Sequence, residues 1–405
     1  MTAVDSPTQF TSELKTQFAD VVGQREQWDG AVLQLNGPIY MSFDWLQTWS
    51  KFYCANKQIR LFVFRDGERI VGLVPIYIDE IGYGPFKLRV ARLIGSPIPP
   101  KVFDPPVDPG FAKQIWSAVL AQLFGKDGCD LLSMGYISQE YAGTEGLTEA
   151  CREKSALVQP CQSTSNEVRT MYELPADFLT YFESINAKEK KIRRKKLRDL
   201  EEVGAVRTEI VKDPAAVESA FEEFAREHTA QWQAEGRTGH FHAWPRGLDY
   251  NRALVKTHGA LDRVYFFKLW VGEQVVTWQY TFAFGNTLFA ELPARLSGPQ
   301  WHKFSLGCTR QIKLLEAAIG EKFQRMDSGL GHYEYKVLTN GVETAVFTHR
   351  IVSASGIRRA RIAFYNKFAA AYRIMLHKIW YRRITPYLPA KWRRGQSEGT
   401  LRLEF

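Results

Sequence analysis

The chain has 405 residues, of which 45% are hydrophobic and 24% charged, and its formal net charge is +9. This length exceeds what one hydrophobic core usually organises, so we expect two or more domains, and the composition excludes a disordered or fibrous protein. The five cysteines are odd in number and form no CxxC pair, which argues against a disulfide framework or a zinc site and indicates a reducing compartment. The positive charge suits an anionic ligand, a nucleic acid or an acidic membrane surface without choosing between them.

We expect neither a targeting segment nor a membrane span. The first thirty residues lack the basic region and apolar stretch of a secretory signal. No apolar run approaches the roughly 18 residues that a bilayer requires. These features predict a cytoplasmic protein, with residues 1–28 forming a leader and a short helix.

The first half alternates helix and strand patterns. Ser42 is a suitable N-cap for a helix whose apolar positions are Trp45, Leu46 and Trp49. The dipeptide Asp66-Gly67 is typical of a hairpin turn between two strands. The other expected elements are strands over 59–64, 70–78 and 130–134, a glycine- and proline-rich segment of loop and short strands over 82–109, and a helix over 111–124.

The second half repeats the order of a hairpin, then a helix, then a strand. Its expected elements are helices over 178–203, 214–236 and 305–319 and strands over 264–271, 275–284, 286–292 and 323–327. The hairpin VFRDGERIVGLVPIY in the first half parallels FFKLWVGEQVVTWQYTF in the second. We interpret this parallel as a duplicated unit, with a boundary near residue 160.

The segment from Ser355 onward is predicted to be helical and basic. Ile357, Phe364, Phe368, Met375 and Ile379 mark one side, and arginines and lysines fill much of the remainder. Such a helix can lie on an anionic membrane surface, or it can cap the second domain. We favour packing with some peripheral contact.

A candidate anion site lies where the helix over 305–319 begins. The free backbone N–H groups and the positive dipole end of a helix favour an anion at that place. We expect the amides of Leu306, Gly307 and Cys308 to bind a pyrophosphate, with Ser305 as the hydroxyl and Lys303 as the added charge. The alternative is an ordinary capped helix packed on a sheet.

A second informative stretch is MDSGLGHYEYK. Asp327 closes a strand, and two glycines then turn the chain and present Tyr335 and Lys336. Residues at the carboxyl ends of strands commonly line ligand crevices in open α/β sheets. The alternative is a glycine turn with a buried tyrosine.

These motifs together resemble the CelD/BcsL-like acyltransferase family of the GNAT superfamily, which is related to the FemAB transferases. The motifs are KEKKIRRKKLRDLEEVG, His228-x-x-x-Trp232-x-x-x-Gly236, WHKFSLG and MDSGLGHYEYK, together with MSFDWLQTWSKFY and LVPIYI in the first half. Leu306 replaces the proline usual in the family at the helix start, and Gly298 stands where relatives often have an acidic residue. The resemblance covers roughly residues 38–350.

The resemblance implies an α/β (α+β) fold with two GNAT-like domains in tandem. Each domain would be a mixed, mostly antiparallel sheet flanked by helices, followed by a basic C-terminal helical extension. The expected bounds are 1–28 for the leader, 29–160 and 161–352 for the two domains, and 353–405 for the tail. The implied donor is an acyl-CoA such as acetyl-CoA, and no metal is expected.

Acyl transfer requires a base, donors for an oxyanion and an acid for the leaving thiolate. Glu291 lies on the strand where GNAT enzymes often place their base, and Asp327 ends the neighbouring strand. The alternative for both is a salt bridge to Arg295 or Arg325. Tyr335 is the candidate acid, because its hydroxyl both donates and accepts.

The remaining candidates concern the acceptor. His228 and Trp232, one turn apart on a helix, would line its site, with the histidine as a base; a buried histidine packed against the tryptophan is the alternative. Lys336 joins this set, as do Arg193 and Arg194 from a run in which eight of eleven residues are basic. A solvated helix face is the alternative for that run.

Three functions follow from this reading. The first is an acyl-CoA-dependent N- or O-acyltransferase acting on a small-molecule or glycan acceptor, in polysaccharide or envelope assembly as the resemblance implies, at the inner membrane if the tail binds lipid. The second is a FemAB-like transferase that uses aminoacyl-tRNA, although no nucleic-acid-binding module is evident. The third is a non-catalytic module that binds a membrane or a complex. The acceptor and the oligomeric state are not predicted.

Overall fold

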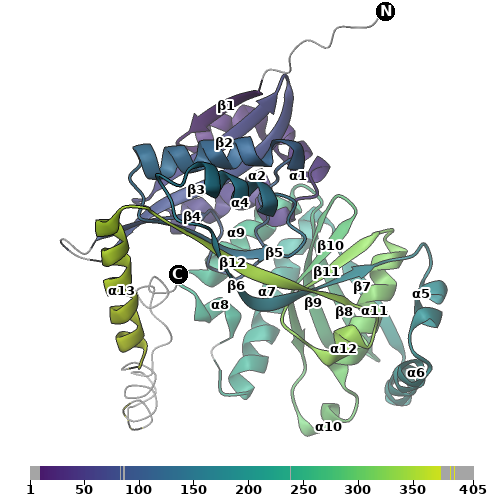
Figure 1. The fold of residues 1–405 in the computed structure, drawn as a ribbon. Helices are drawn as coiled ribbons and strands as arrows, with labels where there is room; N and C mark the ends of the chain where they lie inside the picture. The colour runs from purple at the N-terminus through teal and green to yellow at the C-terminus, as the bar shows by residue number, and fades with distance from the viewer. Residues whose placement is uncertain are drawn as a thin grey trace, which may run out of the picture. The chain divides into compact units, whose positions relative to one another are not determined.

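The computed structural model describes residues 10–82, 84, 87–237, 239–374, 384 and 387. The chain forms two compact units (Figure 1). The first contains residues up to 165 and returns to include those from 347 onward, and the second contains residues 166–346. Each is an α/β unit with a mixed sheet flanked by helices, which confirms the predicted fold class.

The first unit is built on the strand order β1-β2-β3-β4-β5-β12. Neighbours from β1 to β4 pair antiparallel, whereas β4 and β5 pair parallel. The strands are β1 (Phe10–Lys15), β2 (Gln58–Asp66), β3 (Arg69–Ile81), β4 (Leu88–Leu93), β5 (Leu131–Ser138) and β12 (Val342–Val352). The helices are α1 (Arg25–Gln34), α2 (Phe43–Tyr53), α3 (Ala112–Leu120), which continues into a π-helical turn η5 (Ala121–Lys126), α4 (Thr144–Glu153) and α13 (Gly356–Ile374), with 3-10 turns η1 (Phe18–Gln24), η2 (Ile39–Met41) and η4 (Pro109–Phe111).

The second unit repeats this order as β7-β8-β9-β10-β11-β6. Here the parallel pair is β10 and β11, and β6 pairs antiparallel with β11. The strands are β6 (Gln162–Glu173), β7 (Val206–Val211), β8 (Val264–Val271), β9 (Gln274–Phe284), β10 (Thr287–Arg295) and β11 (Arg325–Leu330). The helices are α5 (Phe178–Ser184), α6 (Ala187–Glu201), α7 (Pro214–Ala234), α8 (His240–Ala243), α9 (Gly247–Gly259), α10 (Pro299–His302), α11 (Leu306–Gly320) and α12 (Glu334–Val337).

The two units therefore share one topology, with an exchanged sixth strand. In each unit a hairpin is followed by a third antiparallel strand, a helix and a parallel strand. The sixth position beside β5 is taken by β12, from the end of the second half, and the one beside β11 is taken by β6, which follows the first half. This explains why residues from 347 onward belong to the first unit.

Helices cover both faces of the second sheet. On one face, Phe221 and Phe224 of α7 pack on Tyr280 of β9. On the other face, residues of α5, α6 and α11 form a core with the inward side chains of the strands, including Tyr181, Leu200 and Leu315. The long helix predicted over 178–203 is divided into α5 and α6, because Asn186 caps α6 by accepting a hydrogen bond from the amide of Lys188 at 2.9 Å.

Some local expectations were wrong. The segment 10–15, assigned to a leader and helix, is the edge strand β1, which pairs with β2. Strands β6, β7 and β12 and helix α4 were not anticipated. Ser42 stands at the N-cap of α2, as predicted, but its side chain makes no capping hydrogen bond.

The basic helix α13 packs in the first unit. Its buried residues Ile362, Tyr365 and Ala369 join a core with residues of β3, β4 and β5. The side marked by Ile357, Phe364 and Phe368 is the exposed one, and the rest of the predicted stripe, Met375 and Ile379, lies outside the described residues. Within the described part of the chain, none of the helices has the length and apolar character needed to cross a bilayer.

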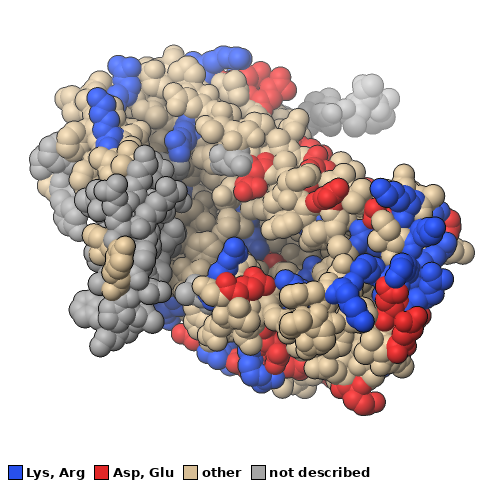
Figure 2. All heavy atoms as spheres, turned by 90° about the horizontal axis from the view of Figure 1, so that it is seen from below, with Lys and Arg blue, Asp and Glu red and all other residues tan. Residues whose placement is uncertain are grey.

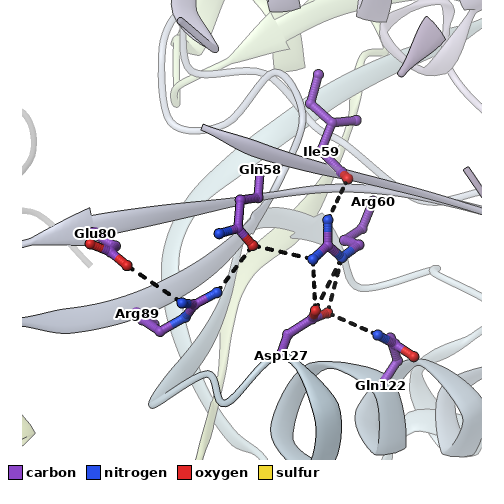
Figure 3. Close-up of polar contacts among 7 residues, drawn as sticks. All are labelled: Gln58, Ile59, Arg60, Glu80, Arg89, Gln122 and Asp127. Carbon is purple, nitrogen blue, oxygen red and sulfur yellow. Dashed lines mark hydrogen bonds and ion pairs between the residues drawn. The ribbon is translucent and has the colours of Figure 1, made fainter. Parts of the chain in front are cut away.

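Ionic contacts of unequal burial connect the elements of the first unit (Figure 3). The guanidinium of Arg60 on β2 holds the carboxylate of Asp127, at the end of the π-helical turn, with Nη2–Oδ1 at 2.7 Å, and the Asp127 side chain is only 8% exposed. Glu80, by contrast, is 43% exposed where it meets Arg89. Gln58 lies between the two, accepting from both Arg60 and Arg89.

These two contacts should differ in their effect on stability. Asp127→Ala leaves the guanidinium of Arg60, which is 16% exposed, without its carboxylate, so we expect a loss of about 3 kcal/mol in the free energy of unfolding. Glu80→Ala removes an exposed partner and should cost less than about 1 kcal/mol. Urea unfolding of both variants measures the difference. Equal losses would contradict the assignment of Arg60–Asp127 as the structural pair.

Candidate functional site

The site begins where two parallel strands separate. The pairing of β10 with β11 runs through three registered pairs, the last being Phe289 with Asp327. Ahead of this pair, the amides of Gln324 and Arg325 donate to the carbonyl of Asn286, which confirms that the segments starting near 286 and 323 are neighbours. Beyond it both strands continue without a registered pair between them.

Each strand departs from regular geometry at the separation. In β10 the register with β9 shifts between Ala290 and Leu292, which makes Glu291 the extra residue of a β-bulge. In β11 the register with β6 shifts between Asp327 and Leu330. A bulge bends its strand and increases the local twist, so the two irregularities direct the strands apart.

The start of α11 lies at the same end of these strands. Ser305 adopts the left-handed conformation, with φ 51°, and its side chain makes no capping hydrogen bond. The amide of Cys308 donates to the Ser305 carbonyl at 2.8 Å, so Cys308 does not contribute a free amide as predicted. The amides of Leu306 and Gly307 have no acceptor in the described part of the chain. A Cβ added at Gly307 would meet nothing within 4 Å, so this turn faces open space.

The loop before α11 is positively charged. Lys303 is exposed, with its ammonium 4.8 Å from the Phe304 ring centroid. The Lys303 carbonyl accepts a hydrogen bond from the Lys196 ammonium, which brings α6 to the start of α11. The side chain of Leu306 points into the core, so only its backbone can serve a ligand.

Tyr335 lies beside the first turns of α11. Burial raises the pKa of its hydroxyl; the neighbouring Arg310 guanidinium opposes that rise, and the Tyr333 and Cys308 side chains add to it. A tyrosine with a raised pKa keeps its proton at neutral pH, which is the state an acid needs.

Lys336 organises the glycine turn after β11. Its buried ammonium donates to the carbonyls of Ser328 at 2.9 Å and of Gly329 at 3.4 Å. Burial lowers the pKa of this ammonium to about 8, and the charges of Asp327 and Glu343 oppose the decrease. Lys336 thus acts on the shape of the turn, which differs from the substrate contact that we predicted.

Asp327 is held by structural contacts. Its Oδ2 accepts from Nε and Nη2 of Arg169 on β6, at 3.0 and 2.9 Å, and its Oδ1 accepts from the Gly329 amide at 2.8 Å. The salt-bridge alternative therefore describes Asp327, with Arg169 as the partner in place of Arg295 or Arg325. These bonds fix the end of β11, which makes Asp327 a positioning residue. Glu291, at the bulge, is the carboxylate that remains as a candidate base.

His228 is fully buried, and both of its ring nitrogens are engaged. Nδ1 lies 2.9 Å from the Pro293 carbonyl of β10, and Nε2 lies 3.1 Å from Nδ1 of His240. Because a carbonyl can only accept, His228 Nδ1 carries the proton and Nε2 accepts from His240. Burial lowers the pKa of His228, so the ring stays neutral. The buried His228 ring therefore cannot contact the acyl acceptor directly. It orients His240, whose ring centroid is 4.8 Å from that of Trp232.

The two arginines predicted to contact substrate have other partners. Arg193 is buried on α6 and pairs with Glu189 at 3.2 Å. Arg194 is exposed, pairs with Glu183 at 2.9 Å and stacks over the Phe182 ring. Figure 2 shows lysine and arginine side chains interspersed with acidic ones at the edge of the molecule where α5 and α6 lie in Figure 1. The basic run is therefore partly neutralised within the fold.

Sequence reasoning missed Arg310. It lies on α11 four residues after Leu306 and four before Leu314, so it occupies the buried stripe of the helix. An arginine among the apolar positions of a helix was the signal in the sequence that could have identified it. Burial lowers its pKa, and the interaction with Tyr335 opposes the decrease.

The corresponding place in the first unit is filled. A Cβ added at Gly146 of α4 would lie 2.6 Å from the Lys113 amide nitrogen, so the backbone of α4 lies against the first turn of α3. The amide of Phe103 donates to the Tyr136 carbonyl of β5 at 2.9 Å, and the Phe103 ring is buried. No comparable opening exists at the start of α3 among the described residues.

The second unit matches a known domain family. Residues 187–337 match the family model described as acetyltransferase (GNAT) domain. The match lies within the second unit and supports an acyltransferase activity for the chain. A search of curated proteins found no match. Among the described residues of this acyltransferase, no group of three or more histidine, cysteine, aspartate or glutamate side chains is arranged to hold a metal ion.

Solved structures resemble the chain at low identity. The crystal structure of FemX is 10% identical with a TM-score of 0.57, and the match covers 80% of this chain and 95% of FemX. The structure of L-PGS from Bacillus licheniformis is 10% identical with a TM-score of 0.48, covering 80% and 90% of the two chains. A tandem GNAT protein from the clavulanic acid biosynthesis pathway is 12% identical with a TM-score of 0.44, covering 85% and 99%.

The lowered pKa of Lys336 predicts a pH dependence of stability. Between pH 8 and the ordinary lysine pKa, the unfolded chain binds a proton that the folded one does not, so this lysine's effect on stability becomes more favourable as pH rises. The free energy of unfolding of the wild type relative to Lys336→Gln should increase by about 2.5 kcal/mol from pH 7 to pH 10. Urea unfolding at both pH values tests this. A difference that does not change with pH would contradict the buried-ammonium assignment.

Proposed function

We propose that this acyltransferase takes its acyl group from an acyl-CoA, with acetyl-CoA as the simplest donor, and transfers it to an amino or hydroxyl group of a small-molecule or glycan acceptor. The observation that carries the proposal is the opening at the start of α11, beside the point where β10 and β11 separate. An unbonded helix N-terminus with open space in front of it suits a phosphate group.

The donor phosphates would be held mainly by backbone. The amides of Leu306 and Gly307 are available as hydrogen-bond donors, and Lys303 and Lys196 add positive charge beside them. A helix N-terminus favours an anion through its dipole as well as its amides. The absence of a side chain at Gly307 lets a ligand approach this turn closely.

The residues around the opening can divide the proton transfers between them. Tyr335 holds a proton that it can give to a leaving thiolate. The proton of the attacking amine or hydroxyl passes to Glu291 at the bulge or to His240, which His228 orients. Trp232, beside His240, supplies a flat surface for the acceptor.

An aminoacyl-tRNA donor is the second candidate, because the FemX structure shares the fold. A tRNA donor would need a cationic surface free to meet many phosphates. Ion pairs occupy much of α6, however: Lys190 and Arg194 meet Glu183, and Lys195 meets Asp199. We therefore favour the smaller donor. Binding of aminoacyl-tRNA with a steep salt dependence would reverse this preference.

The wider setting rests on the resemblance to CelD/BcsL-like enzymes. It suggests polysaccharide or cell-envelope assembly on the cytoplasmic side, at the inner membrane if α13 meets anionic lipid. Flotation with anionic vesicles addresses the membrane part separately from the chemistry.

The donor proposal is tested by placing a charge in the opening. In Gly307→Glu the added carboxylate repels phosphates, so the Kd for acetyl-CoA should weaken by about tenfold or more. Gly307→Gln adds similar bulk without charge and should weaken binding less. Isothermal titration calorimetry measures both.

Gly320, at the other end of α11, provides the positional control. A Cβ there also meets nothing within 4 Å, so Gly320→Glu places the same charge on the same helix away from the opening. Acetyl-CoA should bind this variant as it binds the wild type. Unchanged binding by Gly307→Glu, or equal weakening by Gly320→Glu, would count against the proposed cradle.

A further inference from the structure

Arg310 is a buried cation for which the fold provides no anion. Its side chain is 6% exposed, its Nε is buried without a hydrogen-bond partner, and among the described residues it has no carboxylate within ion-pair distance. The groups that influence it are the Tyr335 hydroxyl, Cys308 and a second cation, Arg295. An arginine stays protonated in proteins, so the charge cannot be removed by losing a proton.

Arg310 lies one turn after Leu306 on α11. Long side chains on a helix lean toward its N-terminus, so we expect the head of Arg310 near the first turn of α11. Its interaction with Cys308, the third residue of the helix, agrees with this direction. The unbonded amides of Leu306 and Gly307 belong to the same turn. The first two turns of α11 therefore carry several hydrogen-bond donors, and beside them the guanidinium has the Tyr335 hydroxyl as a neutral acceptor while its Nε has none.

Two other arginines of the second unit with little exposure each have a carboxylate. Arg169 holds Asp327 at 2.9 Å and Arg193 holds Glu189 at 3.2 Å. A buried charge without a partner destabilises a fold, so stability does not explain why this arginine is present. The difference between Arg310 and these two arginines is explained if its partner arrives from outside.

We propose that Arg310, together with Tyr335 and the amides of Leu306 and Gly307, forms a pocket for an oxyanion, either a phosphate or a carboxylate. The inference deepens the proposed function, on which it rests for the identity of the ligand. Two parts of a substrate can supply this group: the phosphate bridge of the CoA donor, or a carboxylate at the end of a dicarboxylic acyl chain. A guanidinium recognises both, because its paired N–H groups match two oxygens.

Inorganic pyrophosphate tests the pocket without a CoA. At constant ionic strength, replacing chloride with pyrophosphate should raise the melting temperature of the wild type, and the Kd for pyrophosphate should be about tenfold weaker or more in Arg310→Gln. Without an anion, Arg310→Gln should melt no lower than the wild type, because it removes an unpaired charge. An equal response of both proteins to pyrophosphate, or no response of either to pyrophosphate and to succinate, would overturn the inference.

Arg193→Gln is the matched control. It removes a buried arginine that has a carboxylate, so it should lower the melting temperature while leaving the pyrophosphate response intact. If Arg310→Gln behaves in the same way as Arg193→Gln, Arg310 is a structural residue and the pocket does not exist.

Two further ligands identify the source of the oxyanion. Binding of ADP to the wild type that is lost in Arg310→Gln assigns the pocket to the phosphate bridge. A preference of the wild type for succinyl-CoA over acetyl-CoA, lost in Arg310→Gln while ADP still binds, assigns it to an acyl carboxylate.

Equal binding of acetyl-CoA, succinyl-CoA and ADP by wild type and variant rejects the pocket and leaves the CoA donor standing. Pyrophosphate binding that depends on Arg310, without binding of any CoA, rejects the donor and leaves the pocket standing.

Discussion

The separation of β10 from β11 is the constraint on which the site depends. Three registered pairs hold the strands together, and beyond them each strand follows its other neighbour. The bulge at Glu291 bends β10 on β9, while Asp327 attaches β11 to β6 through Arg169. Lys336 then gathers the carbonyls of the glycine turn that follows. The open first turn of α11 follows the same end of β10, so the positions of the proposed base, acid and anion site all derive from the same irregularity.

The two units differ at the start of the helix that joins their parallel strands. This place is filled in the first unit and open in the second. Both units place a helix between two parallel strands, as β4-α3-β5 and as β10-α11-β11. In the first unit the backbone of α4 lies against the start of α3, at Gly146. In the second, Gly307 faces open space. The same topology therefore supports packing in one unit and a candidate donor site in the other, and the difference arises from which segment lies against the first helical turn.

Local patterns in the sequence predicted much of this arrangement. The hairpins, the helix near 305 and the neighbouring segments near 286 and 323 follow from periodicity and turn residues. The exchange of β6 and β12 was not predictable, because strand order depends on contacts between residues far apart in the sequence. The partners of Asp327 and His228 were missed for the same reason, since Arg169 and Pro293 lie distant in the chain. Arg310 was overlooked although its place on the apolar stripe of α11 was visible.

A crystal structure of the protein with CoA tests the central claim most directly. The account predicts the pyrophosphate within hydrogen-bonding distance of the Leu306 and Gly307 amides, and the pantetheine arm between the separated ends of β10 and β11. CoA bound elsewhere, or strands that close to pair beyond Asp327, would contradict the account.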